Sequence, residues 1–298
     1  GPVVIDLPKD ILFEEGPYFT LENKRPCAYK PQLMEDHQQI EKAVKLLADA
    51  EQPIIYGGGG LINSGTRASQ LLREFADLTG YPVTLTLMGL GAFPASNRHF
   101  LGMLGMHGTY EANLAMHQCD VMFNIGARFD DRVTGRIKDF SPNSTKIHVD
   151  IDPSSINKNV KVDLPIIGDA ALILEQMIQV WKEKGYKRND GMLSEWWKKI
   201  EVWRDKKCLD FKQDSKIIKP QYAIRRLFEK TQKTDAYITT EVGQHQMWAA
   251  QYYGFDQPNR WMTSGGLGTM GYGLPAAMGV QIAHPDALVI DIAGEASI

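Results

Sequence analysis

Cysteine is scarce in this sequence of 298 residues, and its three cysteines, Cys27, Cys119 and Cys208, are odd in number and far apart. The sequence contains no CxxC pair and no Cys/His cluster, which argues against a disulfide framework and against a zinc site. Long apolar runs are missing as well, because stretches such as residues 287–293 fall far short of the roughly 20 residues that span a bilayer. The small number of isolated cysteines predicts a reducing, cytosol-like compartment.

An excess of charge of one sign is also missing, since 33 Lys and Arg residues stand against 36 Asp and Glu residues, for a formal net charge of −3. A nucleic-acid-binding face and a polybasic membrane anchor both need clustered Lys and Arg, so we expect neither nucleic acid nor membrane as a partner. With 43% hydrophobic residues the chain can build a sizeable core. Its length suggests about two domains.

Residues 36–186 alternate between helical and extended patterns. Short apolar strands are predicted at residues 53–56, 83–87, 121–125 and 146–151, and apolar residues recur at helical spacing between them. Strands separated by helices are typical of a parallel sheet with helices on both faces. We therefore predict a doubly wound α/β domain here.

Three further segments complete the predicted organisation. Residues 1–35 are interrupted by proline and start with a short strand at 3–6, which favours the tail of a preceding domain followed by a linker. Residues 187–218 are predicted to be a linker with one solvated amphipathic helix. A second α/β pattern occupies residues 219–298 and ends just after a strand. We expect the chain to be a piece of a longer protein.

The strand ends of the first domain carry candidate binding residues, because ligands of open α/β sheets bind at the carboxyl ends of the strands. The glycine run 57–60 is either a phosphate cradle or a turn needed for tight packing. Arg128 and Arg132 could contact an anion or form surface ion pairs. Asp150 could accept from ribose hydroxyls. Asp169 could face a nucleotide or cap its helix.

Candidate residues also follow strands of the second domain. Gly243, Gln244 and His245 stand where a strand passes into a helix and could meet an anion. The glycine-rich loop 264–273 contains Met270, which could support a planar cofactor or fill a core. Gly294 and Glu295 end the last strand, where a carboxylate could bind Mg²⁺ or simply be exposed.

Five longer runs resemble a known family. They are Leu104-Gly-Met-His-Gly-Thr109, Gly126-Ala-Arg-Phe-Asp-Asp-Arg-Val-Thr-Gly135, His148-Val-Asp-Ile-Asp-Pro153, Val242-Gly-Gln-His-Gln-Met-Trp-Ala-Ala-Gln251 and residues 264–277. Together they span nearly the whole chain, and the sequence resembles the catalytic large subunits of acetolactate synthases, which are thiamine-diphosphate enzymes. The resemblance implies a Rossmann-like, six-stranded, DHS-like central FAD-binding domain over 36–186. It also implies a truncated thiamine-diphosphate-binding domain over 219–298.

The resemblance also implies a reaction, its cofactors and its partners. Pyruvate is joined to a second 2-keto acid, pyruvate or 2-ketobutyrate, with release of CO₂, in the first common step of branched-chain amino-acid biosynthesis. The implied cofactors are thiamine diphosphate, Mg²⁺ and FAD. The full-length subunit is expected to form a homodimer or homotetramer in the bacterial cytoplasm, with a small regulatory subunit as a possible partner. By itself, the present chain is expected to be inactive.

Site residues are carried over by motif. For FAD the resemblance implies Gly58, Gly59, Thr86, Leu87, Met106, His107, Gly126, Ala127, Arg128, Asp130, Arg132, Val133, Asp150, Ile151, Asp169 and Ala170. For thiamine diphosphate it implies Val242, Gly243, Gln244, His245, Gly268, Met270, Gly294, Ala296 and Ser297. Met270, Arg132 and Gln244 are given catalytic roles, with Arg132 on the carboxylate of the second substrate. Glu295, where the family has Asp, is the predicted metal ligand.

Two other readings stay open from the sequence. One is a different FAD and thiamine-diphosphate enzyme, of the pyruvate oxidase or glyoxylate carboligase type. The other is a nucleotide-binding module without catalysis.

Overall fold

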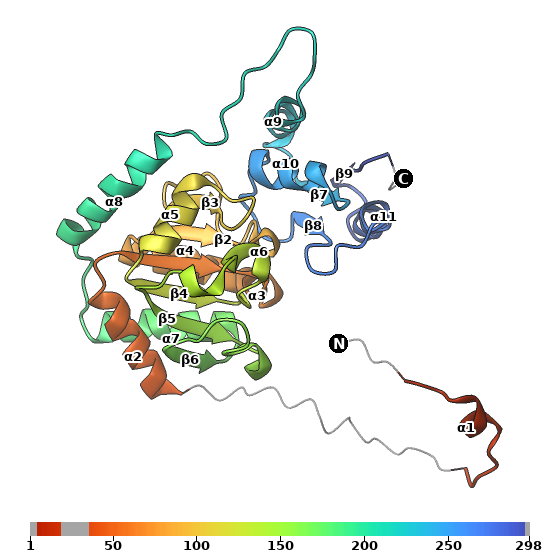
Figure 1. Cartoon of the computed structure of the whole chain (residues 1–298), viewed down its shortest axis with the longest axis horizontal. Coiled ribbons are helices and arrows are strands. Elements are labelled where there is room, and N and C mark those ends of the chain that lie inside the picture. Colours follow the sequence, from red (N-terminus) through yellow and green to blue (C-terminus); the bar gives the residue numbers. More distant parts are fainter. Residues whose placement is uncertain (1–4, 19–35, 296–298) are drawn as a thin grey trace. The chain divides into compact units, whose positions relative to one another are not determined.

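The structure is a computed structural model that describes residues 5–18 and 36–295 (Figure 1). The chain divides into two compact units, residues 1–31 and 32–298. In the first unit, the described residues form one short helix, α1 (Lys9–Phe13). The strand predicted at 3–6 lies partly outside the described residues, and residues 5 and 6 are not in a strand.

The second unit contains a six-stranded sheet in which every neighbouring pair is parallel. Its strands are β1 (Pro53–Gly57), β2 (Val83–Leu85), β3 (Phe100–Met103), β4 (Val121–Ile125), β5 (Thr145–Asp150) and β6 (Leu164–Ile167). The spatial order β3-β2-β1-β4-β5-β6 is that of a Rossmann sheet, with the topological switch point between β1 and β4. The predicted doubly wound fold is confirmed.

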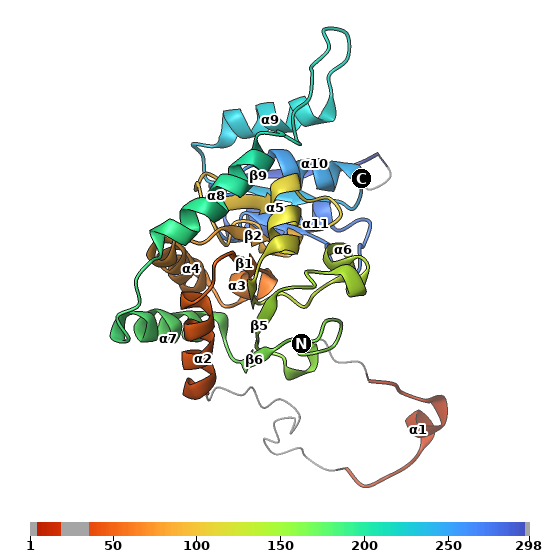
Figure 2. The same ribbon diagram turned by 60° about the vertical axis from the view of Figure 1, so that its left-hand side comes forward.

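Helices cover both faces of this sheet (Figure 2). One core forms beneath α2 (His37–Ala48), α4 (Thr66–Thr79) and α7 (Ala170–Glu183). The other forms beneath α5 (Tyr110–Gln118) and α8 (Asp190–Arg204). Side chains of β1 alternate between the two cores, since Ile55 packs in the first while Ile54 and Tyr56 pack in the second.

The structure corrects the interpretation of the linker. Helix α8 is not a solvated linker helix, because Leu193, Trp196 and Ile200 are 2% exposed or less. The indole Nε1 of Trp196 donates to the carbonyl of Pro53 at 3.0 Å. An apolar stripe at helical spacing therefore packs α8 onto the sheet, while its mixed charges face outward.

A second sheet follows in the same unit. Its elements are α9 (Pro220–Thr231), β7 (Ala236–Thr240), α10 (Gln244–Tyr252), β8 (Trp261–Thr263), α11 (Gly273–Ala283) and β9 (Leu288–Ile292). Its strands are parallel in the order β8-β7-β9. One apolar core continues from Leu90 of the central domain to Trp261, whose Nε1 donates to the carbonyl of Leu87 at 3.0 Å.

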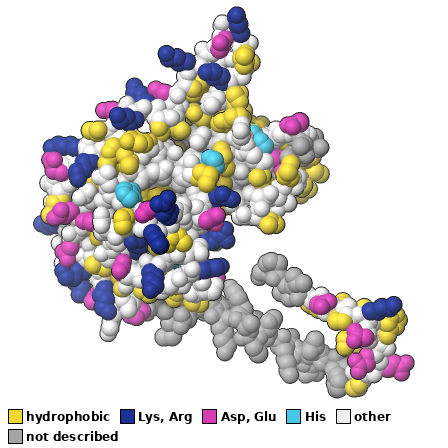
Figure 3. All heavy atoms as spheres, in the orientation of Figure 1, with side chains coloured by type: hydrophobic (Ala, Val, Ile, Leu, Met, Phe, Trp, Pro, Cys, Tyr) yellow, Lys and Arg dark blue, Asp and Glu magenta, His cyan; other side chains and the backbone are white. Residues whose placement is uncertain are grey.

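The surface is mixed in charge. In Figure 3, Lys and Arg side chains are interspersed with Asp and Glu over the visible face. Among the described residues, no helix is long and apolar enough to cross a membrane.

Candidate functional site

A cavity of about 780 Å³ lies at the carboxyl ends of the central strands and reaches loops of the second sheet. It includes the switch point between β1 and β4, where doubly wound sheets bind their ligands. All central-domain residues predicted for FAD line it except Gly58. These are Gly59, Thr86, Leu87, Met106, His107, Gly126, Ala127, Arg128, Asp130, Arg132, Val133, Asp150, Ile151, Asp169 and Ala170. From the second domain, Val242 and Gly268 also line it.

The glycine run after β1 serves packing in the first place. A Cβ added at Gly58 would lie 2.2 Å from the carbonyl oxygen of Gly126. The amides of Gly58 and Gly60 donate to the carbonyls of Ile125 and Gly126, so these two amides are not available to a phosphate. Of the two predictions for this run, the tight-packing one explains Gly58 and Gly60, while Gly59 faces the cavity.

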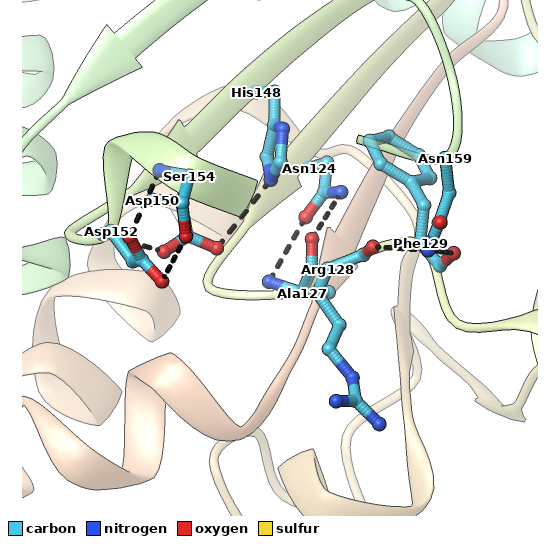
Figure 4. Close-up of polar contacts among 9 residues, drawn as sticks. All are labelled: Asn124, Ala127, Arg128, Phe129, His148, Asp150, Asp152, Ser154 and Asn159. Atoms are coloured by element: carbon cyan, nitrogen blue, oxygen red, sulfur yellow. Dashed lines mark hydrogen bonds and ion pairs between the residues drawn. The ribbon is translucent and has the colours of Figure 1, made fainter. Parts of the chain in front are cut away.

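The loop after β4 is built around buried contacts. The Asn124 side chain donates to the Ala127 carbonyl at 2.7 Å and accepts from the Ala127 amide at 3.2 Å. Phe129 adopts a left-handed φ of 54° and is 1% exposed. Its carbonyl accepts from the Asn159 side chain at 2.9 Å. These contacts hold the loop while the Arg128 side chain points away from them (Figure 4).

Asp130 organises the next turn. Its Oδ1 accepts from the Arg132 amide at 3.1 Å and caps α6 (Asp131–Thr134), and its Oδ2 pairs with the Arg128 guanidinium at 2.6 Å. Burial opposes ionisation of Asp130, but the hydrogen bonds and the nearby guanidinium outweigh it and lower the pKa of this carboxyl. The ion-pair interpretation is thus correct for Arg128.

Arg132 differs from Arg128. Within the described residues, no carboxylate lies at ion-pair distance from the Arg132 guanidinium, which lines the cavity. A guanidinium presents a planar fork of N–H donors that matches a carboxylate. The geometry therefore leaves Arg132 able to bind an anion in the cavity.

Two carboxylates, of Asp150 and Asp169, lie beyond β4 at the ends of β5 and β6. Asp150 ends β5, and its Oδ1 accepts from the Asp152 amide at 2.9 Å. Asp169 caps α7, since its Oδ1 accepts from the amides of Ala171 and Leu172 and from the Ser64 hydroxyl. The helix-capping prediction for Asp169 is therefore confirmed, and its side chain also borders the cavity.

Residues after β3 form the opposite wall. Met106 is 63% exposed, and His107 is exposed beside it. The His107 carbonyl accepts from the Gln251 side chain at 2.9 Å, which ties this loop to α10. The imidazole itself stays available to a ligand.

Glu241 anchors the glycine-rich loop of the second domain, a role that the sequence did not reveal. This carboxylate is fully buried, and its oxygens accept from the amides of Gly271, Tyr272 and Gly273 at 2.7, 3.2 and 2.5 Å. Three charge-assisted hydrogen bonds at the start of α11 fix the end of the loop. The sequence could not reveal this role, because Glu241 and the loop residues that it holds are about 30 positions apart in the chain.

The predicted thiamine-diphosphate residues lie around the same loop, but most do not border the cavity. Met270 is 59% exposed and Gln244 is exposed. The His245 ring packs against Gly243 and lies 3.4 Å from where a Cβ of Gly294 would stand. Its Nε2 is buried without a hydrogen-bond partner among the described residues. Ala296 and Ser297 lie outside the described residues.

No cluster of three or more His, Cys, Asp or Glu side chains that could hold a metal occurs within residues 5–18 and 36–295. Glu295 is exposed and is the single carboxylate predicted there. Its metal role stays a prediction.

Sequence reasoning missed several lining residues. They include Tyr56, Asn63, Ser64, Ser155, Gln246 and Met247. The glycine-rich loop 264–273 was singled out from the sequence, and in the structure a Cβ at Gly265 would lie 2.5 Å from Met88 Sδ. A glycine at this point allows the two loops to approach closely.

Comparisons with known proteins give the family. Residues 40–177 match the thiamine pyrophosphate enzyme central domain, and residues 241–298 match the C-terminal TPP-binding domain of the same enzymes. The chain belongs to the thiamine pyrophosphate enzymes. The resemblance to acetolactate synthase large subunits is confirmed over the whole of this chain.

Three relatives illustrate this. The chain is 49% identical over 300 residues to the acetolactate synthase isozyme 3 large subunit of Escherichia coli, covering 100% of this chain and 52% of that protein. It is 51% identical over 300 residues to the acetolactate synthase large subunit of Buchnera aphidicola subsp. Schizaphis graminum, with the same coverage. It is 42% identical over 296 residues to the Mycobacterium leprae acetolactate synthase, covering 99% of this chain and 47% of that protein. The chain spans about half the length of these relatives.

Proposed function

We propose that this chain provides the FAD-binding domain and part of the diphosphate-binding domain of an acetolactate synthase. The reaction joins pyruvate to a second 2-keto acid, pyruvate or 2-ketobutyrate, and releases CO₂, as the first common step of branched-chain amino-acid biosynthesis. The observation that carries the proposal is a cavity lined from both sheets, in which the Arg132 guanidinium has no carboxylate partner among the described residues. The names of the relatives support the reaction.

FAD is the ligand that fits this cavity. Its volume of about 780 Å³ lies within the usual range of ligand sites, roughly 300–1,000 Å³. Arg128 can meet the pyrophosphate, and Asp150 can accept from ribose hydroxyls. The apolar side chains of Leu87 and Met106 offer a surface for a ring system.

Thiamine diphosphate is assigned to the loops around β7 and β9. When bound, it supplies a nucleophilic carbon that allows a 2-keto acid to lose CO₂ and its remaining carbons to join a second acid. The buried Nε2 of His245 and the α10 N-terminus can donate to diphosphate oxygens. We assign Met270 as the apolar support of the cofactor and Gln244 as a polar contact. Glu295 would ligate Mg²⁺ together with diphosphate oxygens and water.

The residues of this chain act on the substrate by position and charge. Arg132 holds the carboxylate of the second 2-keto acid by a bidentate contact. Val242 and Leu267 contribute apolar surface to the cavity wall. Glu241 keeps the start of α11 in place, so the loop before it presents Gly268 and Met270 in one arrangement.

Partners and location follow from the same proposal. The full-length protein is proposed to be a homodimer or homotetramer in the cytoplasm of a bacterial cell. The word "large subunit" in the names of relatives supports a smaller regulatory subunit as its partner. Neither nucleic acid nor membrane is proposed as a partner.

The function is tested in the full-length protein that contains residues 1–298. Purified protein is supplied with thiamine diphosphate, Mg²⁺, FAD and pyruvate, and acetolactate is measured colorimetrically as acetoin after acid treatment. We expect acetolactate without net reduction of FAD. Stoichiometric transfer of electrons to FAD or to an added quinone would instead identify a pyruvate oxidase type of enzyme.

A further inference from the structure

Four buried polar side chains form one row across the central sheet. Thr84, Tyr56, Asn124 and His148 are register neighbours on β2, β1, β4 and β5. All four are fully buried. Interior positions of a doubly wound sheet are ordinarily apolar, so a polar row at this level requires an explanation.

Two members of this polar row hold backbone groups, one in strand β3 and one in the loop after β4. The Thr84 hydroxyl donates to the Gly102 carbonyl at 2.8 Å. The Asn124 side chain closes the turn at Ala127, as described above. The row therefore crosses the sheet near the cavity, and Asn124 supports the backbone of one loop that lines it.

His148 has no such contact. Neither of its ring nitrogens has a hydrogen-bond partner among the described residues. It pairs with Asp150, which lies two residues further along β5 and on the same side of the strand. The distance from His148 Nε2 to Asp150 Oδ2 is 3.6 Å, slightly longer than a hydrogen bond (Figure 4).

The imidazole is held in this direction by packing. Phe129 meets the His148 ring edge-on, with centroids 5.0 Å apart and planes at 73°. Phe129 itself is fixed by edge-on contacts with Tyr56 and Phe140. The ring can therefore not turn away, and its Nε2 stays directed at the carboxylate.

The Asp150 carboxylate is held from a second side. Its Oδ1 accepts from the Asp152 amide at 2.9 Å, and its side chain is 13% exposed at the edge of the cavity. A small movement of Oδ2 would bring it to hydrogen-bond distance from His148. Its position would then be set by one donor on each oxygen, with the remaining lone pairs free for a ligand.

We propose that His148 is a positioning residue that holds the Asp150 carboxylate for the ribose hydroxyls of FAD. This rests on the proposed function, because it assumes that FAD occupies the cavity. His148 needs only its Nε2–H, and its role is to preorganise Asp150 before the ligand arrives.

The test is a set of FAD titrations, followed by flavin fluorescence, on the full-length protein. His148→Phe keeps an aromatic ring and removes both nitrogens, and we expect FAD to bind at least about tenfold more weakly. His148→Gln keeps an N–H donor and should recover most of the affinity. Asp150→Ala should weaken FAD binding, and adding His148→Phe to it should cause no further loss.

A control and a second readout separate positioning from a purely structural role. His99 is also buried, at 4% exposed, but among the described residues it has no contact with a carboxylate that lines the cavity, so His99→Phe should lower the melting temperature without changing FAD affinity. In the protein without FAD, the ¹⁵N shift of His148 Nε2 should change on Asp150→Asn. A variant that only lost stability would not change the ¹⁵N shift of His148.

The outcomes distinguish this inference from the proposed function. If His148→Phe binds FAD as the wild type does, or if its effect adds fully to that of Asp150→Ala, the positioning role is overturned while FAD binding stands. If the wild-type protein itself does not bind FAD, both the FAD assignment and the inference are overturned.

Discussion

Arg132 is the side chain on which the proposed chemistry depends most directly. If it holds the carboxylate of the second substrate, Arg132→Ala should impair joining of the two acids more than loss of CO₂. Removing a bidentate, charge-assisted contact should cost about 2–3 kcal/mol in that step. The measurement is the ratio of acetolactate formed to CO₂ released by the full-length protein.

The control for this variant is Arg136→Ala. Arg136 pairs with Asp139, is 81% exposed and does not line the cavity, so its removal should leave the ratio unchanged. A parallel fall of both products in Arg132→Ala would contradict the proposed role.

Glu295 tests the metal assignment. Mg²⁺ requires near-octahedral oxygen ligands, and a carboxylate one methylene shorter can reach the same ion if the Gly294 turn adjusts. We expect Glu295→Asp to shift the half-saturating Mg²⁺ concentration by no more than about tenfold, roughly 1.4 kcal/mol. Glu295→Ala should weaken Mg²⁺ far more. An unchanged half-saturation in the Ala variant would show that Glu295 is not a ligand.

Asp291 of β9 makes stability depend on pH. Burial raises the pKa of this carboxyl above 3.8, although the Thr239 hydroxyl donates to it at 2.9 Å, and Glu241 adds a nearby negative charge. In the unfolded protein the Asp291 carboxyl has its ordinary pKa, so it loses its proton at a lower pH than in the folded protein. The free energy of unfolding therefore falls as pH rises from 3.8 through the raised pKa of the folded state. Asp291→Asn should flatten this fall and raise the melting temperature at pH 7. Melting curves across that range, with Asp286→Asn as the control, measure it.

From the sequence we could name candidate ligand-binding positions, but not the hydrogen bonds that hold the surrounding loops. Strand-end residues such as Asp150 and Arg132 were found because the carboxyl ends of parallel strands converge. Glu241 was not found, because its three partner amides are about 30 residues away and backbone donors leave no trace in a sequence. The glycines after β1 looked like a phosphate cradle, yet close packing against the β4 loop already requires them.

The mixed charges of helix α8 predicted a solvated helix, but packing of its apolar residues buries one face of it. Trp196→Ala removes a fully buried indole and its hydrogen bond to Pro53, and we expect a loss of about 3–5 kcal/mol in the free energy of unfolding. Val202→Ala on the same helix is the matched control, because Val202 is 62% exposed and should change it by less than about 0.5 kcal/mol. Urea unfolding of both variants gives the comparison. Equal stabilities would mean that α8 does not belong to the core.

Buried central strands were predictable, whereas short outer strands were not. β1 and β4 read as continuous apolar runs bounded by turn residues, which is typical of parallel strands covered on both faces. β3 contains Gly102 with φ of 94°, and β6 contains Pro165, and both residues argue against a strand when read from sequence. At the two edges of the sheet these residues are tolerated, because an outer strand has a neighbour on one side only.

The domain boundaries predicted from sequence, 36–186, 187–218 and 219–298, remain predictions. The family matches cover 40–177 and 241–298. Within residues 32–298, however, the two sheets share one apolar core, and the cavity is lined from both. Binding of FAD and of the diphosphate cofactor is therefore expected to be coupled through the loops at 87–89 and 264–268.

The residues proposed for thiamine diphosphate lie beside an exposed apolar helix. Helix α11 buries only Gly273 completely, while Leu274, Met278 and Ile282 are 45%, 59% and 81% exposed. Such an apolar surface is ordinarily covered by another part of a protein. The relatives are about twice as long as this chain, which agrees with a site completed by further residues.

The 298-residue chain expressed by itself should therefore bind FAD but form no acetolactate. The residues proposed for FAD line one cavity together, whereas the cofactor that carries the reaction would rest on an exposed Met270 and one predicted metal ligand, Glu295. Flavin-fluorescence titration should show saturable binding, lost on Arg128→Ala with Asp150→Ala. The acetoin assay with thiamine diphosphate, Mg²⁺ and FAD should stay at background, with the full-length protein as the positive control. Turnover of about 1 s⁻¹ or more by the isolated chain would contradict this expectation, because that is the rate of an ordinary complete enzyme.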